Sequence, residues 1–112
     1  MSNPKFRLFK DQRGYYRFTL DSINGEPILH ATEGYSTKQA CQTGIASVKV
    51  NAPIESRYTR SQATNGQFYF TLSALNGEKI GMSEMYISSS SRDNGINAVK
   101  RDAPNAPTVD LT

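Results

Sequence analysis

Cys41 and His30 are the side chains in this sequence best suited to nucleophilic catalysis. They are the only cysteine and the only histidine among 112 residues, which excludes an internal disulfide and any site that needs two imidazoles. A thiol nucleophile needs a base within hydrogen-bond reach, and no motif brings these two residues together. Cys41 falls on the apolar side of a predicted helix, where a free cysteine is usually a small buried hydrophobe. We therefore predict no nucleophilic site.

Carboxylates that could act as an acid–base pair or bind a metal recur at matching positions, Glu26 with Glu78 and Glu33 with Glu84. Glu26 follows a predicted hairpin turn, where a carboxylate is ordinarily solvated or paired with a lysine. Glu33 lies shortly before a predicted helix, whose backbone N–H groups and dipole favour a carboxylate. Glycine motifs of the G-x-G-x-x-G and Walker types are absent. The sequence therefore predicts a protein that is not an enzyme and binds no cofactor and no metal.

Aromatic and arginine side chains alternate with apolar ones on the predicted strands. If the apolar positions point into the core, the opposite face of the sheet carries Arg7, Tyr15, Arg17 and Tyr69. Bases could stack on these tyrosines while the arginines neutralise phosphates, and an acidic peptide or a partner protein would also fit. The same residue types are ordinary on a solvated sheet face, and RNP-type RNA-binding motifs are missing. We treat these four residues as a candidate ligand face.

These candidates lie within an internal duplication. Residues 14–20 align with 66–72 at an offset of 52, and residues 44–53 align with 95–104 at an offset of 51, so one residue is lost between them, by our reading near Pro27. Two copies of a unit that cannot close its own core should pack together as a pseudo-two-fold domain. We expect a single domain over residues 1–112 with repeats at about 5–56 and 57–112. The polar residues that both copies share are Asn24, Glu26, Glu33, Tyr35, Asn76, Glu78, Glu84 and Tyr86.

Hydrophobic periodicity predicts the same elements in each repeat. Alternating apolar residues indicate strands around 6–8, 15–20 and 27–32, and again near 56–62, 67–73 and 79–83. The dipeptides Asn24-Gly25 and Asn76-Gly77 are typical of a tight primed hairpin turn, in which both central residues have positive φ. Helical spacing follows from Ser36, with Gln39 completing a capping box, and from about 89 to 101, capped by Ser88. Extended pieces at 54–56 and 107–111 end the repeats.

The two helices each contain a glycine, Gly44 and Gly95, at matching interior positions. An interior helix glycine costs roughly 1 kcal/mol relative to alanine. A cost that occurs twice predicts a close contact of the helix with the sheet or with the other helix.

The motifs Phe-x-Phe-x-Leu, Asn-Gly-Glu, Ser-Glu-x-Tyr, Gly-Ile-x-x-Val-Lys and Ala-Pro together resemble the YegP-like family of small bacterial proteins, in its two-repeat form. The resemblance covers about residues 5–104, with Thr32 in place of the motif serine in the first copy. It implies an α+β fold of tandem β(3)-α-β repeats, which form one antiparallel sheet with two helices on one face and exchanged C-terminal strands. Residues 54–57 and 109–111 would then pair with the opposite repeat, and the chain would be a monomer. The family carries no activity to transfer.

Charge and composition narrow the class of function further. The chain has 13 Lys plus Arg against 10 Asp plus Glu, a net charge of +3 spread evenly over both halves, so no basic tail is present. No stretch approaches the roughly 18 apolar residues of a membrane span, and residues 1–10 contain no apolar core of a signal peptide. We expect a cytoplasmic, non-enzymatic binding or interaction module of unknown ligand, with a nucleic-acid-binding protein as the alternative.

Overall fold

The computed structural model describes residues 3–112, which form seven strands, two α-helices and two short 3-10 helices. The elements of the first repeat are β1 (Lys5–Lys10), β2 (Tyr16–Asp21), β3 (Pro27–Ala31), α1 (Lys38–Asn51) and the 3-10 helix η1 (Glu55–Arg57). Those of the second repeat are β4 (Tyr58–Gln62), β5 (Phe68–Ser73), β6 (Lys79–Met82), α2 (Ser89–Asp102), the 3-10 helix η2 (Ala103–Asn105) and β7 (Thr108–Asp110).

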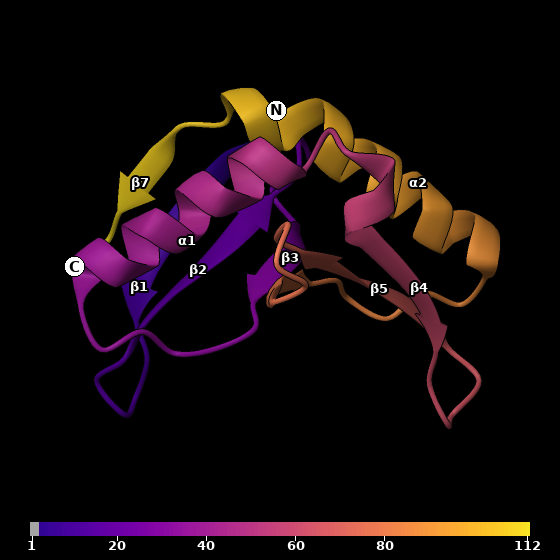
Figure 1. Ribbon diagram of the computed structural model, residues 1–112, viewed down its shortest axis with the longest axis horizontal. Coiled ribbons are helices and arrows are strands. Elements are labelled where there is room, and N and C mark those ends of the chain that lie inside the picture. Colours follow the sequence, from indigo (N-terminus) through magenta and orange to yellow (C-terminus); the bar gives the residue numbers. More distant parts are fainter. Residues whose placement is uncertain (1–2) are drawn as a thin grey trace.

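The strands form one sheet in the order β4-β5-β6-β3-β2-β1-β7. Both helices lie on the same side of this sheet and leave its other side open (Figure 1). We call the side away from the helices the open face. The predicted α+β fold of two repeats is therefore confirmed. The sheet is mixed rather than wholly antiparallel, because β7 runs parallel to β1. Within residues 3–112 no helix has the length and apolar character needed to cross a membrane.

The core lies between the sheet and the helices, as the alternating pattern predicts. Phe6, Leu8 and Leu20 are 0% exposed, and the antiparallel register places Phe6 opposite Leu20 and Leu8 opposite Phe18. Because successive strand residues face opposite sides, this register also puts Arg7 and Arg17 on the open face. Burial of large aliphatic and aromatic side chains stabilises such a core by about 1.5–3 kcal/mol each.

The helix caps are shifted by one residue from the prediction in the first repeat. The N-cap of α1 is Thr37, whose side chain accepts a hydrogen bond from the backbone N–H of Ala40, so the capping box with Ser36 is wrong. Ser88 caps α2 as predicted, accepting from the N–H of Ser91. Ser36 and Thr37 can both cap a helix; only the path of the chain into α1 selects Thr37.

The hairpins at Asn24-Gly25 and Asn76-Gly77 are not primed turns. Only glycine adopts positive φ among the described residues, with Gly25 at 85° and Gly77 at 87°. Each asparagine keeps negative φ, and its side-chain oxygen accepts the backbone N–H two residues on, from Glu26 at 3.0 Å in the first turn. A turn with a single left-handed glycine at its end is the three-residue hairpin type.

The exchange of C-terminal strands occurs for one repeat only. The β7 strand of the second repeat pairs with β1 of the first, with Val109 beside Arg7. The corresponding segment of the first repeat, predicted to be a strand at 54–57, is instead η1, which leads directly into β4 (Figure 1). The prediction for 54–57 is wrong because these residues connect α1 to β4 and cannot also extend along the sheet.

The length difference between the repeats lies after β3, not near Pro27. Both repeats have the same register shift, after Leu20 in β2 and after Leu72 in β5, so the hairpins that follow are equally long. His30 faces Thr19 as Met82 faces Thr71, which makes His30 and Met82 equivalent. After this position each repeat forms a bridge back to its second strand, through Tyr35 to β2 in the first repeat and through Tyr86 to β5 in the second. The first repeat needs one residue more to reach its bridge. The extra residue therefore belongs to the segment 31–34.

Candidate functional site

The strands β3 and β6 join the two repeats, and the approximate two-fold axis passes between them. His30 pairs with Met82 and Ala31 pairs with Gly81 across this junction. At the axis Leu29 and Gly81 are equivalent, and a Cβ atom on Gly81 would lie 2.7 Å from the Leu29 side chain. One leucine thus fills a space that two could not share.

A groove of about 480 Å³ lies over this junction. It draws on both repeats, because β3 and the segment after it contribute one wall and β6 and the segment after it contribute the other. The side chains that give it its character are Arg17, His30, Thr32, Met82, Glu84 and Met85. We call this the junction groove.

Polar contacts within the junction groove cross between the repeats. The Nε2 atom of His30 lies 2.9 Å from a carboxylate oxygen of Glu84, and both side chains are substantially exposed. The Thr32 hydroxyl donates to the backbone carbonyl of Lys79 at 2.8 Å. Met82 and Met85 remain exposed, by 36% and 44%. Thioether side chains are flexible and polarizable, which suits an adaptable binding surface.

The predicted ligand face is only partly brought together. Arg7 and Arg17 are diagonal neighbours on β1 and β2, since Arg7 faces Thr19 and Arg17 faces Phe9. Tyr15 directly precedes β2 and is 44% exposed. Tyr69 lies on β5, and β6 and β3 separate it from β2, which is roughly 14 Å at ordinary strand spacing. Of the four residues, only Arg17 lines the junction groove.

Both arginines of this face already have partners. The guanidinium of Arg7 contacts the carboxylate of the buried Asp21 at 2.6 Å, and Asp21 also accepts from the Thr19 hydroxyl at 3.1 Å. Arg17 donates to the backbone carbonyl of Ala31 at 3.2 Å and lies 3.8 Å from Asp11. These contacts reduce the positive charge available to a phosphate.

The tyrosines shared by the repeats support the helices. Tyr35 stacks on Phe18 at 6.4 Å between ring centroids, and Tyr86 stacks on Phe70 at 6.5 Å. A Cβ on Gly44 would lie 2.5 Å from the Tyr35 hydroxyl, and Gly95 meets Tyr86 in the same way. The predicted close contact is therefore real, and its partner is a tyrosine at the strand-to-helix corner. Burial is the main cause that raises the pKa of Tyr35, and the negative charge of the neighbouring Glu33 adds to it.

The other shared polar residues divide into turn formers and solvated carboxylates. Asn76 accepts the N–H of Glu78 at 2.9 Å, as Asn24 accepts that of Glu26. The carboxylates are exposed, and of these only Glu84 reaches the junction groove. In residues 3–112 no three His, Cys, Asp or Glu side chains come together as metal ligands would.

Cys41 and His30 lie on opposite sides of the sheet. Cys41 is 0% exposed on the inner side of α1, and burial raises the pKa of its thiol to about 11. A neutral thiol is a poor nucleophile. Sequence reasoning correctly placed Cys41 in the core. It did not place His30 and the two methionines in one groove, because their neighbours come from the other repeat.

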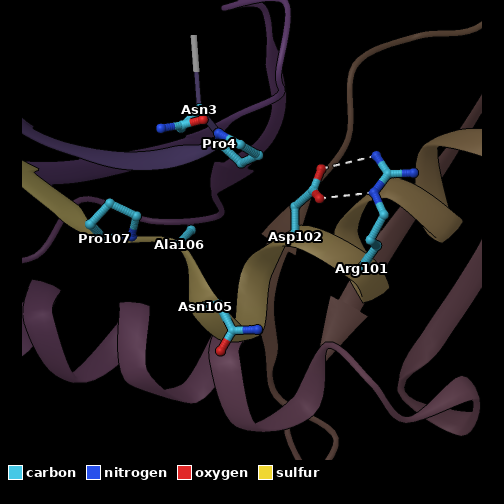
Figure 2. A pocket seen from close by; sticks show the side chains of 7 residues that line it. All are labelled: Asn3, Pro4, Arg101, Asp102, Asn105, Ala106 and Pro107. Carbon is cyan, nitrogen blue, oxygen red and sulfur yellow. Dashed lines mark hydrogen bonds and ion pairs between the residues drawn. The ribbon is translucent and has the colours of Figure 1, made fainter.

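A second hollow of about 370 Å³ lies between the start of the chain and η2 (Figure 2). Asn3 and Pro4 line one side, and Asn105 and Pro107 line the other. The two charged residues that line it already pair with each other, because the guanidinium of Arg101 donates two hydrogen bonds of 2.9 and 3.0 Å to the carboxylate of Asp102. This leaves few polar groups to bind a ligand.

Two segments of the chain, residues 11–58 and 63–110, match the domain of unknown function DUF1508. A UPF0339 protein of Bordetella pertussis is 52% identical over 97 residues, which covers 87% of this chain and 86% of that protein. The chain belongs to the YegP-like UPF0339 family. The UPF0339 protein YegP of Escherichia coli is 43% identical over 107 residues, 96% of each chain. The family resemblance predicted from the motifs is confirmed.

Solved structures of this family have the same fold. The solution NMR structure of YegP from E. coli, described as a protein of unknown function, superposes with a TM-score of 0.91 at 41% identity and covers all of this chain and 96% of its own. The NMR structure of a UPF0339 protein from Shewanella oneidensis gives 0.91 and 41%, with 100% and 93% coverage. These relatives are uncharacterised, so family membership assigns no activity.

Proposed function

We propose that the protein is a non-catalytic binding module whose ligand surface is the junction groove. The observation that carries this proposal is the composition of the groove: exposed Met82 and Met85 lie beside Arg17, His30 and Glu84, and residues of both repeats are required to build it. Concave surfaces with apolar area and a few convergent polar groups are the usual ligand sites of proteins. The buried, neutral Cys41 thiol supports a function without covalent catalysis.

The ligand that fits this groove is a peptide segment of a partner protein. The groove holds one arginine, one carboxylate and one histidine that contacts the carboxylate, so its charge is close to balanced. Balanced charge with exposed methionine favours an apolar side chain flanked by polar groups over a polyanion. We extend the proposal to a monomer in the cytoplasm; the monomer is supported by the pairing of β3 with β6, which joins the two repeats in one sheet within one chain.

A peptide library tests this function. The immobilised protein is panned against random peptides, and recovered peptides are titrated into the protein and into the double variant Met82→Glu, Met85→Glu. We expect the variant to bind them at least about tenfold more weakly, because two charges replace the apolar contacts. Leu75→Glu is the matched control, since Leu75 is 81% exposed outside the groove. Equal binding to the double variant, or no enriched peptide, would refute the groove as the ligand surface.

Nucleic acid is the second candidate, and it rests on the end of the sheet beside the β1–β2 hairpin. A shallow hollow there is lined by Arg13, Arg17, Asp11 and Gln12, and Tyr15 is exposed next to it. A mixed-sequence single-stranded oligonucleotide should then bind with a steep dependence on salt. Binding should be lost in the double variant Arg13→Ala, Arg17→Ala, because both arginines line the hollow. Salt-independent binding, or none at low salt, excludes this candidate.

A further inference from the structure

The outer edge of β4 is the structural counterpart of the β1 edge that β7 covers. Tyr58 faces Leu72 in the second repeat as Phe6 faces Leu20 in the first, and the register stays equivalent along both pairs of strands. The backbone groups that β1 presents to β7 are therefore matched by groups that β4 presents outward. Within residues 3–112 no strand lies beside β4 on that side (Figure 1).

The covered edge shows how a strand binds in this position. The N–H of Phe6 donates to the carbonyl of Pro107, and the N–H of Leu111 donates to the carbonyl of Leu8, both at 2.8 Å. The strand runs parallel, with Leu8 beside Asp110. On β4 the equivalent of Phe6 is Tyr58, whose N–H already donates to Glu55 of η1. Because the register is equivalent, the backbone N–H and C=O groups of Arg60 and Gln62 also point outward and are available to a new strand.

The β4 strand has few of the features that protect an exposed edge. Proteins guard such edges with lysine, proline, bulges, very short strands or inward-pointing charges, and the one such feature of β4 is Arg60, whose charge is met by Glu55 and Asp93. The five residues Tyr58–Gln62 contain no lysine and no proline, and their pairing with β5 has no register shift. The single charge, Arg60, is turned to the helix side, where it contacts Glu55 at 2.6 Å and Asp93 at 3.2 Å.

The charges beside this edge favour an acidic residue in the incoming strand. Arg60, Arg92 and Lys100 are linked through Glu55 and Asp93 into one cluster, which carries three positive and two negative charges. A strand in the β7-like register would place its third residue beside Arg60, where β7 has Asp110 beside Leu8. A carboxylate at that position would balance the cluster.

We propose that the β4 edge is a strand-addition site for an extended peptide of a partner protein. The peptide runs parallel to β4, with an aliphatic or β-branched residue on the open face beside Thr59 and an acidic residue next in sequence beside Arg60. Backbone hydrogen bonds supply the affinity and the alternating side chains supply the selectivity. This site is separate from the junction groove, so neither proposal depends on the other.

The chain's own C-terminal segment supplies the probe. A peptide Ala-Pro-Thr-Val-Asp-Leu-Thr, copied from residues 106–112, is titrated into the intact protein while amide shifts and hydrogen exchange are followed by NMR. We expect slowed exchange at the amides of Arg60 and Gln62. The matched control is the same peptide N-methylated at its valine and leucine, which loses two backbone donors and should bind at least about tenfold more weakly. A peptide with asparagine for the aspartate should bind a few-fold more weakly.

A protein variant gives an independent check. Arg60→Pro removes the outward N–H, and edge strands tolerate proline at such a position, so we expect a folded protein that no longer binds the peptide. Arg60→Gln keeps the N–H and should retain most of the binding. If Arg60→Pro does not fold, the N-methylated peptide decides. The proposal is overturned if both peptides bind equally, if the β4 amides stay unprotected, if only the amides of β1 respond, or if β4 is already protected by self-association without peptide.

Discussion

The two repeats share a fold but have diverged where they face outward. In the first repeat the open face carries a connected set of charges and hydroxyls, with Arg7, Asp21 and Thr19 in contact. The equivalent residues of the second repeat are all uncharged, and the hydroxyl of Thr71 is buried with no hydrogen-bond partner among the described residues. Most positions that face the helices remain apolar in both repeats, although Arg60 stands in the place of Leu8 and Ser83 in the place of Ala31.

The junction and the edges differ in the same way. Leu29 occupies the axis in one repeat and Gly81 in the other, and β7 covers β1 while no strand among residues 3–112 covers the edge of β4. In a symmetric dimer of identical single repeats, the same residue would have to occupy both sides of the two-fold axis. Fusion of the two copies in one chain removes that constraint, so each half can specialise.

The largest effect that tests this comparison is expected at the axis. Leu29→Gly should lower the free energy of unfolding by about 4 kcal/mol through a cavity, and Gly81→Leu should lower it by about 3 kcal/mol through overpacking. In the double variant the leucine returns from the other side, so we expect the loss to be about 3 kcal/mol rather than the sum. Chemical denaturation of the four proteins measures the coupling. Simple additivity would mean that the two positions do not share one space.

A comparable cycle can be run in both helices. Gly44→Ala and Gly95→Ala should each destabilise the protein by about 1–3 kcal/mol, because the added methyl meets the hydroxyl of Tyr35 or Tyr86. Replacing the facing tyrosine by phenylalanine removes that hydroxyl and should recover part of the loss, because the ring carbon that bore it, 2.9 Å from a Cβ on Gly44 and 2.8 Å from one on Gly95, remains. Thermal unfolding reports each cycle. If the two repeats respond differently, the packing under the helices has diverged as the open face has.

Removal of the exchanged strand makes the two edges alike. A chain ending at Pro107 lacks β7, and we expect its free energy of unfolding to fall by about 1–3 kcal/mol through lost backbone hydrogen bonds and the contact between Lys38 and Asp110. The residue 106–112 peptide should then restore the melting temperature when added in excess. An unchanged melting temperature of the truncated protein would show that β7 adds nothing to stability.

The smallest expected effect is the pH dependence that comes from Glu55. Hydrogen bonds from Arg60 and then Lys100 lower the pKa of its carboxyl from 4.5 to about 2. A carboxyl with a lowered folded-state pKa stabilises the protein above its ordinary pKa, and this contribution is lost as the pH falls from about 4.5 towards 2. Glu55→Gln should therefore give a flatter stability profile in that window. Because the Glu55 side chain is exposed, the difference should be modest and should shrink in high salt.

Local patterns in the sequence were sufficient for the elements and the core. Alternation at Phe6, Leu8, Phe18 and Leu20 predicted which side of each strand is buried, and the spacing of Cys41 predicted the inner side of α1. Both follow from the fixed periods of strand and helix. The duplication and its motifs predicted the family and the single sheet. The errors at Ser36 and at the turns are local choices between conformations that similar residues all permit, whereas the extra residue expected near Pro27 was located in 31–34 only by the strand pairing.

The surfaces where ligands could bind were decided by tertiary structure. His30, Met82 and Glu84 are ordinary residues in their own segments, and they form a groove only because β3 pairs with β6 across the axis. The sequence also predicts the extended tail that becomes β7. It does not predict that residues 54–57 form the connection from α1 to β4. Which edge is covered depends on the path that the chain takes after each helix, and no periodicity within a segment encodes that path.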